Sequence, residues 1–300
     1  MRRLTGGGGQ VPGRNPLTAV ITTVPAEYES MRSHLPNLRD RIVGDHGLRI
    51  EVGALPGSGW QVALAESGEF GAPFAPLVND IVQALHPDAL LFVGIAGGLE
   101  EGLRIGDVVV ATRVYAFRGG KLTPEGFYAR PQSWHPSHRM LQAARYALHD
   151  TPRVFFKAIA AGDVVINSQQ SSLLSQLKRH YNDAAAIEME GAGMAHAGHL
   201  TAGVETLTIR GISDVVNTAK DFEIHGGAQQ YAAARAAEVA VAVLRKFDPL
   251  PDQSVDETNY GGDHIDFRGS TFFGPVAGKV TTERPHGDDV NFGRRDLNEG

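Results

Sequence analysis

Acidic side chains stand directly after apolar, strand-like runs in this sequence. Glu27 follows the first such run, Asp214 follows a later one, and Glu188 and Glu190 flank a methionine among small apolar residues. Ligands of open α/β sheets bind at the carboxyl ends of the strands, and carboxylates among apolar neighbours are costly to bury without hydrogen-bond partners. These four carboxylates are therefore candidates for binding a ligand and for acid–base chemistry.

Each of these motifs also has an ordinary structural explanation. A Glu at the start of a helix, such as Glu27, interacts favourably with the helix dipole. Asp214 follows Arg-Gly-Ile-Ser and could cap the next helix. The segment Gly-Ile-Ala-Gly-Gly at 94–98 is, taken alone, a tight turn that also allows close approach of a backbone or ligand.

Other kinds of chemistry find little support. The chain has no cysteine, which removes thiol nucleophiles, zinc thiolate sites, iron–sulfur clusters and disulfides. It has no Gly-x-Ser-x-Gly elbow, and Gly6–Gly9 is neither preceded by a strand nor followed by a helix, as a nucleotide loop requires. Two histidine pairs, 135 with 138 and 196 with 199, lack a nearby carboxylate at metal-ligand spacing. We expect no metal and no cofactor.

The composition is that of a globular protein. Of 300 residues, 42% are hydrophobic and 21% charged, and the net charge of −6 gives no reason to expect nucleic acid or an anionic membrane as a partner. No apolar run is long enough to cross a bilayer, and the N-terminus has no apolar segment typical of a secretion signal. We expect a cytoplasmic protein.

Glycine and proline divide the chain into three parts. Residues 1–16 are expected to be a flexible N-terminal lead, because they hold many glycines and almost no apolar surface. Residues 17–248 are expected to form one catalytic domain. Residues 249–300 are expected to be a disordered tail, in which the alternating segment 265–276 could add as a strand to a partner's sheet.

Within the central part, strand-like and helix-like runs alternate, which predicts an α/β fold. Several strand-like runs are apolar at every position, so the sheet must be covered on both faces. We expect a three-layer α/β/α sandwich with a central mixed, mostly buried sheet. The expected strands are 17–22, 61–65, 89–95, 107–114, 155–161 and 206–209. The expected helices are 27–35, 73–85, 137–149, 169–180, 188–199 and 226–247, the last with Tyr231, Val239, Val243 and Phe247 on one buried stripe.

The motifs taken together resemble a known family. Glu-Met-Glu at 188–190 and Arg-Gly-Ile-Ser-Asp at 210–214 follow the early Glu27 and Gly-Ile-Ala-Gly-Gly in the expected order. This order is similar to that of the purine nucleoside phosphorylase and uridine phosphorylase superfamily, and more narrowly to its 5′-methylthioadenosine/S-adenosylhomocysteine nucleosidases. The resemblance runs from Thr18 to Phe247 and includes Glu-Ser-Gly at 66–68, Gly-Asp-Val-Val-Val at 106–110 and Gly-Asp-Val-Val-Ile-Asn at 162–167.

The resemblance implies roles for the carboxylates in hydrolysing a purine N-glycosidic bond. Asp214 would protonate N7 of the departing base, with Ser213 orienting its carboxyl group. Glu190 would bind the ribose hydroxyls and be ordered by Arg210. Glu27 would activate water as the general base, with Glu29 as the alternative.

The same resemblance implies further substrate-binding residues. They are Glu188 and Met189, the latter packed against the sugar, Ser67 and Gly68 beside the water or phosphate, Val164, Val165 and Ile166 around the purine ring, and Phe222 closing over the base. The family also implies a homodimer.

Two other functions stay open. Phosphorylases of this superfamily carry a Gly-Asp-Pro-x-Arg type loop after the first strand, whereas this chain has Thr-Thr-Val-Pro-Ala-Glu at 22–27, with no Arg and with a negative charge that repels phosphate. Hydrolysis is therefore preferred over phosphorolysis. The second alternative is a non-catalytic nucleoside-sensing or effector module, with which a long tail for docking is compatible.

Overall fold

The computed structural model describes residues 15–44, 46–68, 74–124, 126–162, 172–201, 203–215 and 225–248. The strands are β1 (Leu17–Thr22), β2 (Arg39–Val43), β3 (Leu48–Ala54), β4 (Gln61–Glu66), β5 (Ala89–Gly98), β6 (Val108–Ala116), β7 (Gly120–Thr123), β8 (Gly126–Ala129), β9 (Gln132–Trp134), β10 (Val154–Ala161), β11 (Ala184–Glu188) and β12 (Glu205–Val215). The helices are α1 (Pro25–Arg32), α2 (Phe74–Leu85), α3 (His138–Ala147), α4 (Ser172–His180), α5 (Gly191–Leu200) and α6 (His225–Leu244).

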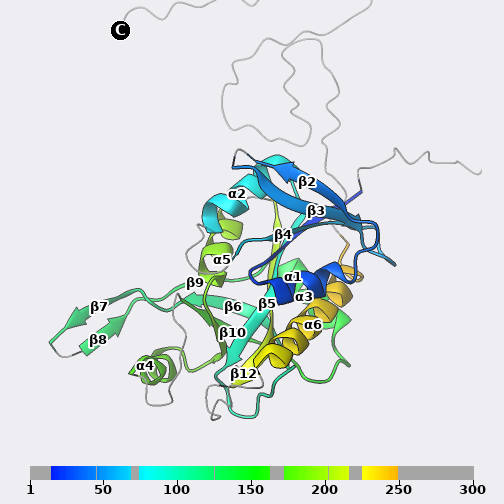
Figure 1. Ribbon diagram of the computed structural model, residues 1–300. Coiled ribbons are helices and arrows are strands. Elements are labelled where there is room, and N and C mark those ends of the chain that lie inside the picture. The colour runs from blue at the N-terminus through cyan, green and yellow to red at the C-terminus, as the bar shows by residue number, and fades with distance from the viewer. Residues whose placement is uncertain are drawn as a thin grey trace, which may run out of the picture. The chain divides into compact units, whose positions relative to one another are not determined.

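One mixed sheet of ten strands organises these elements (Figure 1). Its order is β11-β10-β6-β12-β5-β1-β4-β3-β2, with β9 paired to β6 and with β7 and β8 forming a separate hairpin. The four neighbouring strands β12, β5, β1 and β4 run parallel. Because parallel strands end at the same edge, residues at the ends of β1, β5 and β12 are brought together.

The sheet also closes on itself at one end. Strand β11 pairs parallel with β10 and antiparallel with the end of β5, where Ala186 lies opposite Gly98 and Ile187 opposite Gly97. Strands β5, β12, β6, β10 and β11 thus form a ring. This closure brings Glu188, at the end of β11, to the edge where β5 and β12 end.

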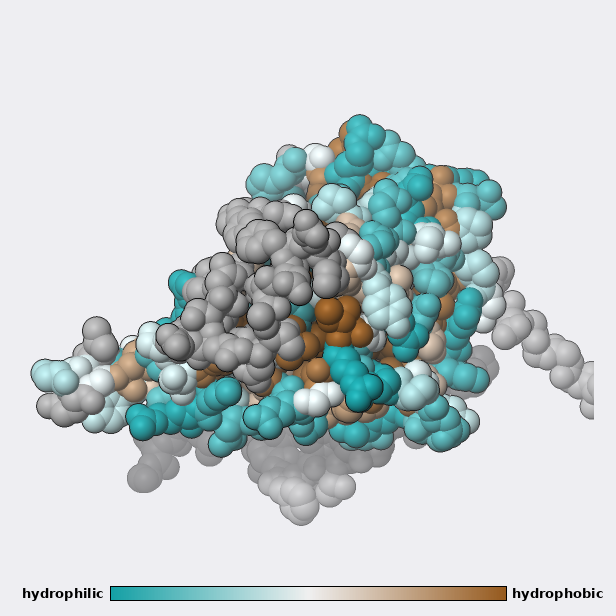
Figure 2. Space-filling model, turned by 60° about the horizontal axis from the view of Figure 1, so that its bottom comes forward, coloured by the Kyte–Doolittle hydropathy of each residue, from teal (hydrophilic) through white to brown (hydrophobic). Residues whose placement is uncertain are grey.

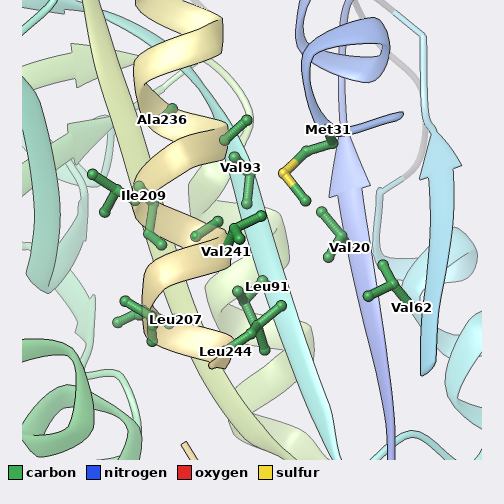
Figure 3. Packing of buried hydrophobic residues seen from close by; sticks show 14 of the residues in the cluster. Val20, Met31, Val62, Leu91, Val93, Leu207, Ile209, Ala236, Val241 and Leu244 are labelled. Atoms are coloured by element: carbon green, nitrogen blue, oxygen red, sulfur yellow. The ribbon is translucent and has the colours of Figure 1, made fainter. Parts of the chain in front are cut away.

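Helices cover both faces of the sheet, as expected for a three-layer α/β/α fold. Helix α6 packs on β12 and β5 and is flanked by α1 and α3, while α2 and α5 pack together on the opposite face. Figure 3 shows the core on the α6 side, where Val241 and Leu244 of the helix meet Leu91, Val93 and Leu207 of the sheet. Strand β5 is buried on both faces, because every position from 89 to 94 is buried.

The expected strands and helices are all present in the described residues, with differences at their ends. The prediction that Tyr231 belongs to the buried stripe of the last helix is wrong. This residue is 54% exposed, and its ring lies against Gly106. The helix expected from 188 begins three residues later, at Gly191, because Glu188 belongs to β11. Strands β2, β3, β7, β8, β9 and β11 were not among the expected strands. Strand β2, for example, has the mostly polar sequence Arg-Asp-Arg-Ile-Val, and most of it is exposed at the sheet edge.

The predicted lead is described only at residues 15 and 16, and the predicted tail at 249–300, including its strand-like segment 265–276, lies outside the described residues. None of the helices that the structure describes is both long and apolar enough to cross a membrane.

Strand β12 and helix α6 approach each other closely at Gly211. A Cβ atom at this position would lie 2.0 Å from the backbone oxygen of Ala232, a contact that only backbone movement can relieve. We expect Gly211→Ala to lower the free energy of unfolding by about 3 kcal/mol, the upper part of the usual range for an overpacked core.

Urea or thermal unfolding checks this prediction. Gly59→Ala is the matched control, because Gly59 has no atoms within 4 Å of the added methyl group and no positive φ. Equal stability of the two variants would contradict the close packing of β12 on α6.

Candidate active site

The predicted site residues converge at the edge where β1, β5 and β12 end. In the β5–β12 ladder, Arg210 lies opposite Gly94 and Asp214 lies opposite Gly97. Helix α1 follows β1 and carries Glu27 to the same edge, where its carboxylate accepts the backbone N–H of Ile95 in β5. Segments more than a hundred residues apart in the chain therefore meet here.

Glu27 is almost fully enclosed. Its side chain is buried, its Oε1 accepts the Ile95 N–H at 2.7 Å, and its Oε2 accepts the Thr23 N–H at 2.7 Å and the Val24 N–H at 3.3 Å. Burial raises the pKa of this carboxyl group above its ordinary value, while Arg210 and the backbone N–H donors oppose that rise. Glu29, the alternative base, is exposed to solvent.

Arg210 is the largest fully buried side chain of the described residues and is 1% exposed. Its Nη2 donates to Oε2 of Glu188 at 2.8 Å, and its guanidinium carbon lies 3.5 Å from the centre of the Phe92 ring. Its Nε and Nη1 have no hydrogen-bond partner in the described part of the chain. A Cβ atom at Gly94 would lie 2.5 Å from both Nη1 of Arg210 and Oε1 of Glu27, so this glycine leaves room for both groups.

Glu188 joins β11 to α5 through its carboxylate. It is buried, and it accepts the backbone N–H of Glu190 at 3.1 Å and that of Gly191 at 2.9 Å, at the N-terminus of α5. We expected Arg210 to order Glu190, but its ion pair is with Glu188. The N–H groups at the start of α5 and the adjacent guanidinium together compensate the buried negative charge.

Glu190 stands at the N-cap of α5 and is half-buried. Burial, with smaller contributions from the negative charges of Glu188 and Glu27, raises the pKa of Glu190 to about 7, and Arg210 opposes this rise. Its carboxyl group therefore changes charge near neutral pH.

Asp214 lies beyond an irregularity in the β5–β12 pairing between Ile212 and Asp214, which leaves Ser213 without a ladder partner. A Cβ atom at Gly97 would be 2.7 Å from Oδ1 of Asp214, so this glycine makes room for the carboxylate. We expected Ser213 to orient Asp214. In the structure the Ser213 hydroxyl lies 3.4 Å from the backbone oxygen of Ala96 and donates to it.

The remaining predicted residues are only partly described. The Ser67 hydroxyl donates to the backbone oxygen of Thr22 at the end of β1, Gly68 has a φ of +81°, and Met189 is half-buried between the two glutamates. The residues predicted to hold the purine ring and to close over the base, Val164, Val165, Ile166 and Phe222, lie outside the described residues. Among described side chains, no group of three or more His, Cys, Asp or Glu could hold a metal ion.

Two site contacts had no signal in the sequence. Phe92 belongs to a run in which every residue is apolar, so nothing marked it as the residue beneath Arg210. The backbone N–H of Ile95 could not be assigned to Glu27 without knowing the tertiary fold. The glycines of the same run were the available signal, and Gly94 and Gly97 do make room for charged side chains.

The raised pKa of Glu190 predicts how stability depends on pH. A carboxyl group with a folded-state pKa of about 7 contributes stability below its unfolded value of 4.5, and this contribution is lost as the pH rises through 7. Between pH 5 and pH 8, the wild type should lose roughly 1–2 kcal/mol more unfolding free energy than Glu190→Gln. Urea unfolding at both pH values measures the difference, and parallel pH dependences for the two proteins would contradict the raised pKa.

Comparisons with known proteins identify the family of this chain. The family model of the phosphorylase superfamily matches residues 18–246. A 5′-methylthioadenosine/S-adenosylhomocysteine nucleosidase from Glaesserella parasuis is 26% identical over 204 residues, which cover 62% of this chain and 81% of the relative. The solved structure of the S. pneumoniae nucleosidase of the same name, with a transition-state inhibitor, is 26% identical with a TM-score of 0.66, and the match covers 77% of this chain and 100% of that one.

Futalosine hydrolase from Helicobacter pylori shares the fold, with a TM-score of 0.65 at 17% identity over 78% of this chain and 99% of its own. The match of the family model spans the described sheet from Thr18 onward, its helices and all the carboxylates of the candidate site. The chain belongs to the phosphorylase superfamily.

Proposed function

We propose that this protein is a purine nucleosidase that hydrolyses the N-glycosidic bond of an adenosine compound and releases the base. The observation that carries the proposal is the placement of the buried carboxylate of Glu27 beside Nη1 of Arg210, which has no hydrogen-bond partner among the described residues. Both groups lie at the same sheet edge as Asp214 and Glu190. Hydrolysis of such a bond passes through a ribosyl cation-like state, which needs an acid at the base, a group holding the sugar, and an activated water.

Glu27 is suited to act as the general base. Although both oxygens accept backbone N–H groups, each carboxylate oxygen has two lone pairs, so one can still take a proton from water. The raised pKa makes this carboxylate a stronger base than an exposed one. Nη1 of Arg210 and Oε1 of Glu27 face the same space, which a side chain at Gly94 would fill. One water in this space could bind to both groups.

Asp214 and Glu190 take the other two roles. Asp214 would protonate the departing purine, and Gly97 leaves the space that its carboxylate occupies. Glu190 would bind the ribose hydroxyls, which an ionised carboxylate accepts as two hydrogen bonds. Met189, between Glu188 and Glu190, would pack against the sugar.

Glu188 has a supporting role in this proposal. Its oxygens are occupied by Arg210 and by the first N–H groups of α5, so it acts by fixing the segment that presents Met189 and Glu190. Ser67 would line the water side of the site from its position against the end of β1.

The names of the relatives suggest the substrate class. Methylthioadenosine and S-adenosylhomocysteine both carry a 5′-thioether on adenosine, and both appear in the names of the relatives. We propose one of these compounds or a related adenosine nucleoside as the substrate, in a role such as methionine salvage. Figure 2 turns the lower end of Figure 1 toward the reader and shows some apolar side chains near the middle of this face.

A homodimer, a cytoplasmic location and docking through the tail at 265–276 are further predictions from the sequence. Phosphorolysis is the competing reaction. It is disfavoured because Glu27 places a negative charge where phosphate would bind, and because Arg210 is already neutralised by Glu188.

A panel of purine compounds tests the proposed function. We expect release of free adenine and a free sugar from methylthioadenosine, S-adenosylhomocysteine or adenosine, at a rate that does not depend on added phosphate. Formation of ribose 1-phosphate would instead establish a phosphorylase. Measurable binding of these compounds and of AMP, without any release of base, would establish a sensing module.

Variants of the carboxylates test the assigned roles. Asp214→Asn and Glu27→Gln should each lower kcat by at least about 100-fold, because positioned acids and bases contribute 10²–10⁴-fold, while nucleoside affinity changes little. Glu29→Gln is the matched control and should retain wild-type turnover, because that side chain is exposed. Full activity of Asp214→Asn would refute its assignment as the acid.

A further inference from the structure

The aromatic ring of Phe92 supports the guanidinium group of Arg210. The guanidinium carbon lies 3.5 Å from the ring centre, and both side chains are buried, with exposures of 1% for Arg210 and 2% for Phe92. The pairing follows from register, because Thr208 lies opposite Phe92 and Arg210 lies opposite Gly94 in the parallel ladder. The Arg210 side chain therefore reaches Phe92, the residue two positions before its ladder partner Gly94 on the neighbouring strand.

Few other contacts fix the plane of this guanidinium. Only Nη2 has a hydrogen-bond partner in the described residues, and a single hydrogen bond leaves the group free to rotate about it. A desolvated guanidinium over an aromatic face gains more than an exposed cation–π contact supplies. The ring is a firm support, because it belongs to a buried cluster that includes Leu90 and Met194.

We infer that Phe92 is a positioning residue for the proposed hydrolysis, holding Arg210 flat so that Nη2 pairs with Glu188 while Nη1 stays beside Glu27. The inference rests on the proposed function. Phe92 contacts neither the water nor the nucleoside in this scheme. It acts only through Arg210.

The charges around Arg210 give this support a measurable consequence. Glu27 of α1, Glu188 at the end of β11 and Glu190 at the start of α5 all surround the guanidinium, and Arg210 lowers the pKa of both Glu27 and Glu190. When the guanidinium is displaced, both carboxyl groups take up protons more readily. A general base that is protonated at higher pH shifts the acidic limb of the rate profile to higher pH.

The test compares three variants in kcat, KM and the pH profile of base release. Phe92→Leu removes the ring but keeps the site apolar, and Phe92→Tyr keeps the ring. Leu90→Ala is the matched control, since Leu90 is buried on the same strand and in the same cluster but is not the ring beneath the guanidinium. Phe92→Leu should lower kcat by about tenfold or more at pH 7 and move the acidic limb upward, with KM changed less than kcat.

Phe92→Tyr should stay within about threefold of the wild type in kcat, because the aromatic face is retained. Leu90→Ala should lose stability without moving the acidic limb. The inference is overturned if Phe92→Leu leaves the pH profile in place, if Phe92→Tyr is as impaired as Phe92→Leu, or if Leu90→Ala shifts the profile equally.

A second readout separates this inference from the proposed function. If the wild type releases no base from any nucleoside, the hydrolytic role fails, and the support of Arg210 is then judged from stability alone. Displacing Arg210 raises the folded-state pKa of Glu27 and Glu190 further. When the pH is raised from 6 to 8, the unfolding free energy of Phe92→Leu should therefore fall by more than that of the wild type. Leu90→Ala should keep the wild-type dependence of unfolding free energy on pH. If the wild type, Phe92→Leu and Leu90→Ala all show the same dependence, Phe92 does not position Arg210.

Discussion

The burial of one positive charge governs the arrangement of this site. Arg210 is withdrawn from water, so the fold must supply compensation, and it does so with the carboxylate of Glu188 and the face of Phe92. A buried ion pair is costly unless its remaining polar atoms find partners. Glu188 satisfies this condition with the N–H groups that begin α5, whereas Arg210 keeps two nitrogens without partners in the described residues. A water or substrate bound at these two unsatisfied donors would contribute most to compensating the buried charge.

The surplus of negative charge around this arginine gives the carboxyl groups different properties. Glu188 takes the direct ion pair, and Glu27 and Glu190 feel the guanidinium only at longer range. Burial then raises the pKa of both of these groups. Neighbouring carboxyl groups with unequal environments are a recurrent way to assign acid, base and binding roles within one site. The proposed division between water activation at Glu27 and sugar binding at Glu190 follows that pattern.

The sequence was sufficient for the fold class and for the residues that gather at the sheet edge, because those depend on local patterns. Apolar runs of strand length identified β1, β5 and β12, and carboxylates directly after them identified Glu27 and Asp214. Pairings between side chains were harder. Arg210 could reach either Glu188 or Glu190, and the choice depends on the register of β11 with β10 and β5, which no local pattern encodes. The support from Phe92 and the turn of Ser213 toward Ala96 depend on tertiary geometry in the same way.

The ring of strands closed by β11 also has a consequence for the order in which the chain can assemble. Glu27 comes early in the sequence, the β5 segment that binds it comes some seventy residues later, and Arg210 arrives only with the last strand. Contacts of such long sequence separation form late, because loop closure must precede them. Until β12 is in place, Glu188 has no guanidinium opposite it. A fragment that ends before β12 therefore lacks both the guanidinium that compensates Glu188 and the carboxylate of Asp214.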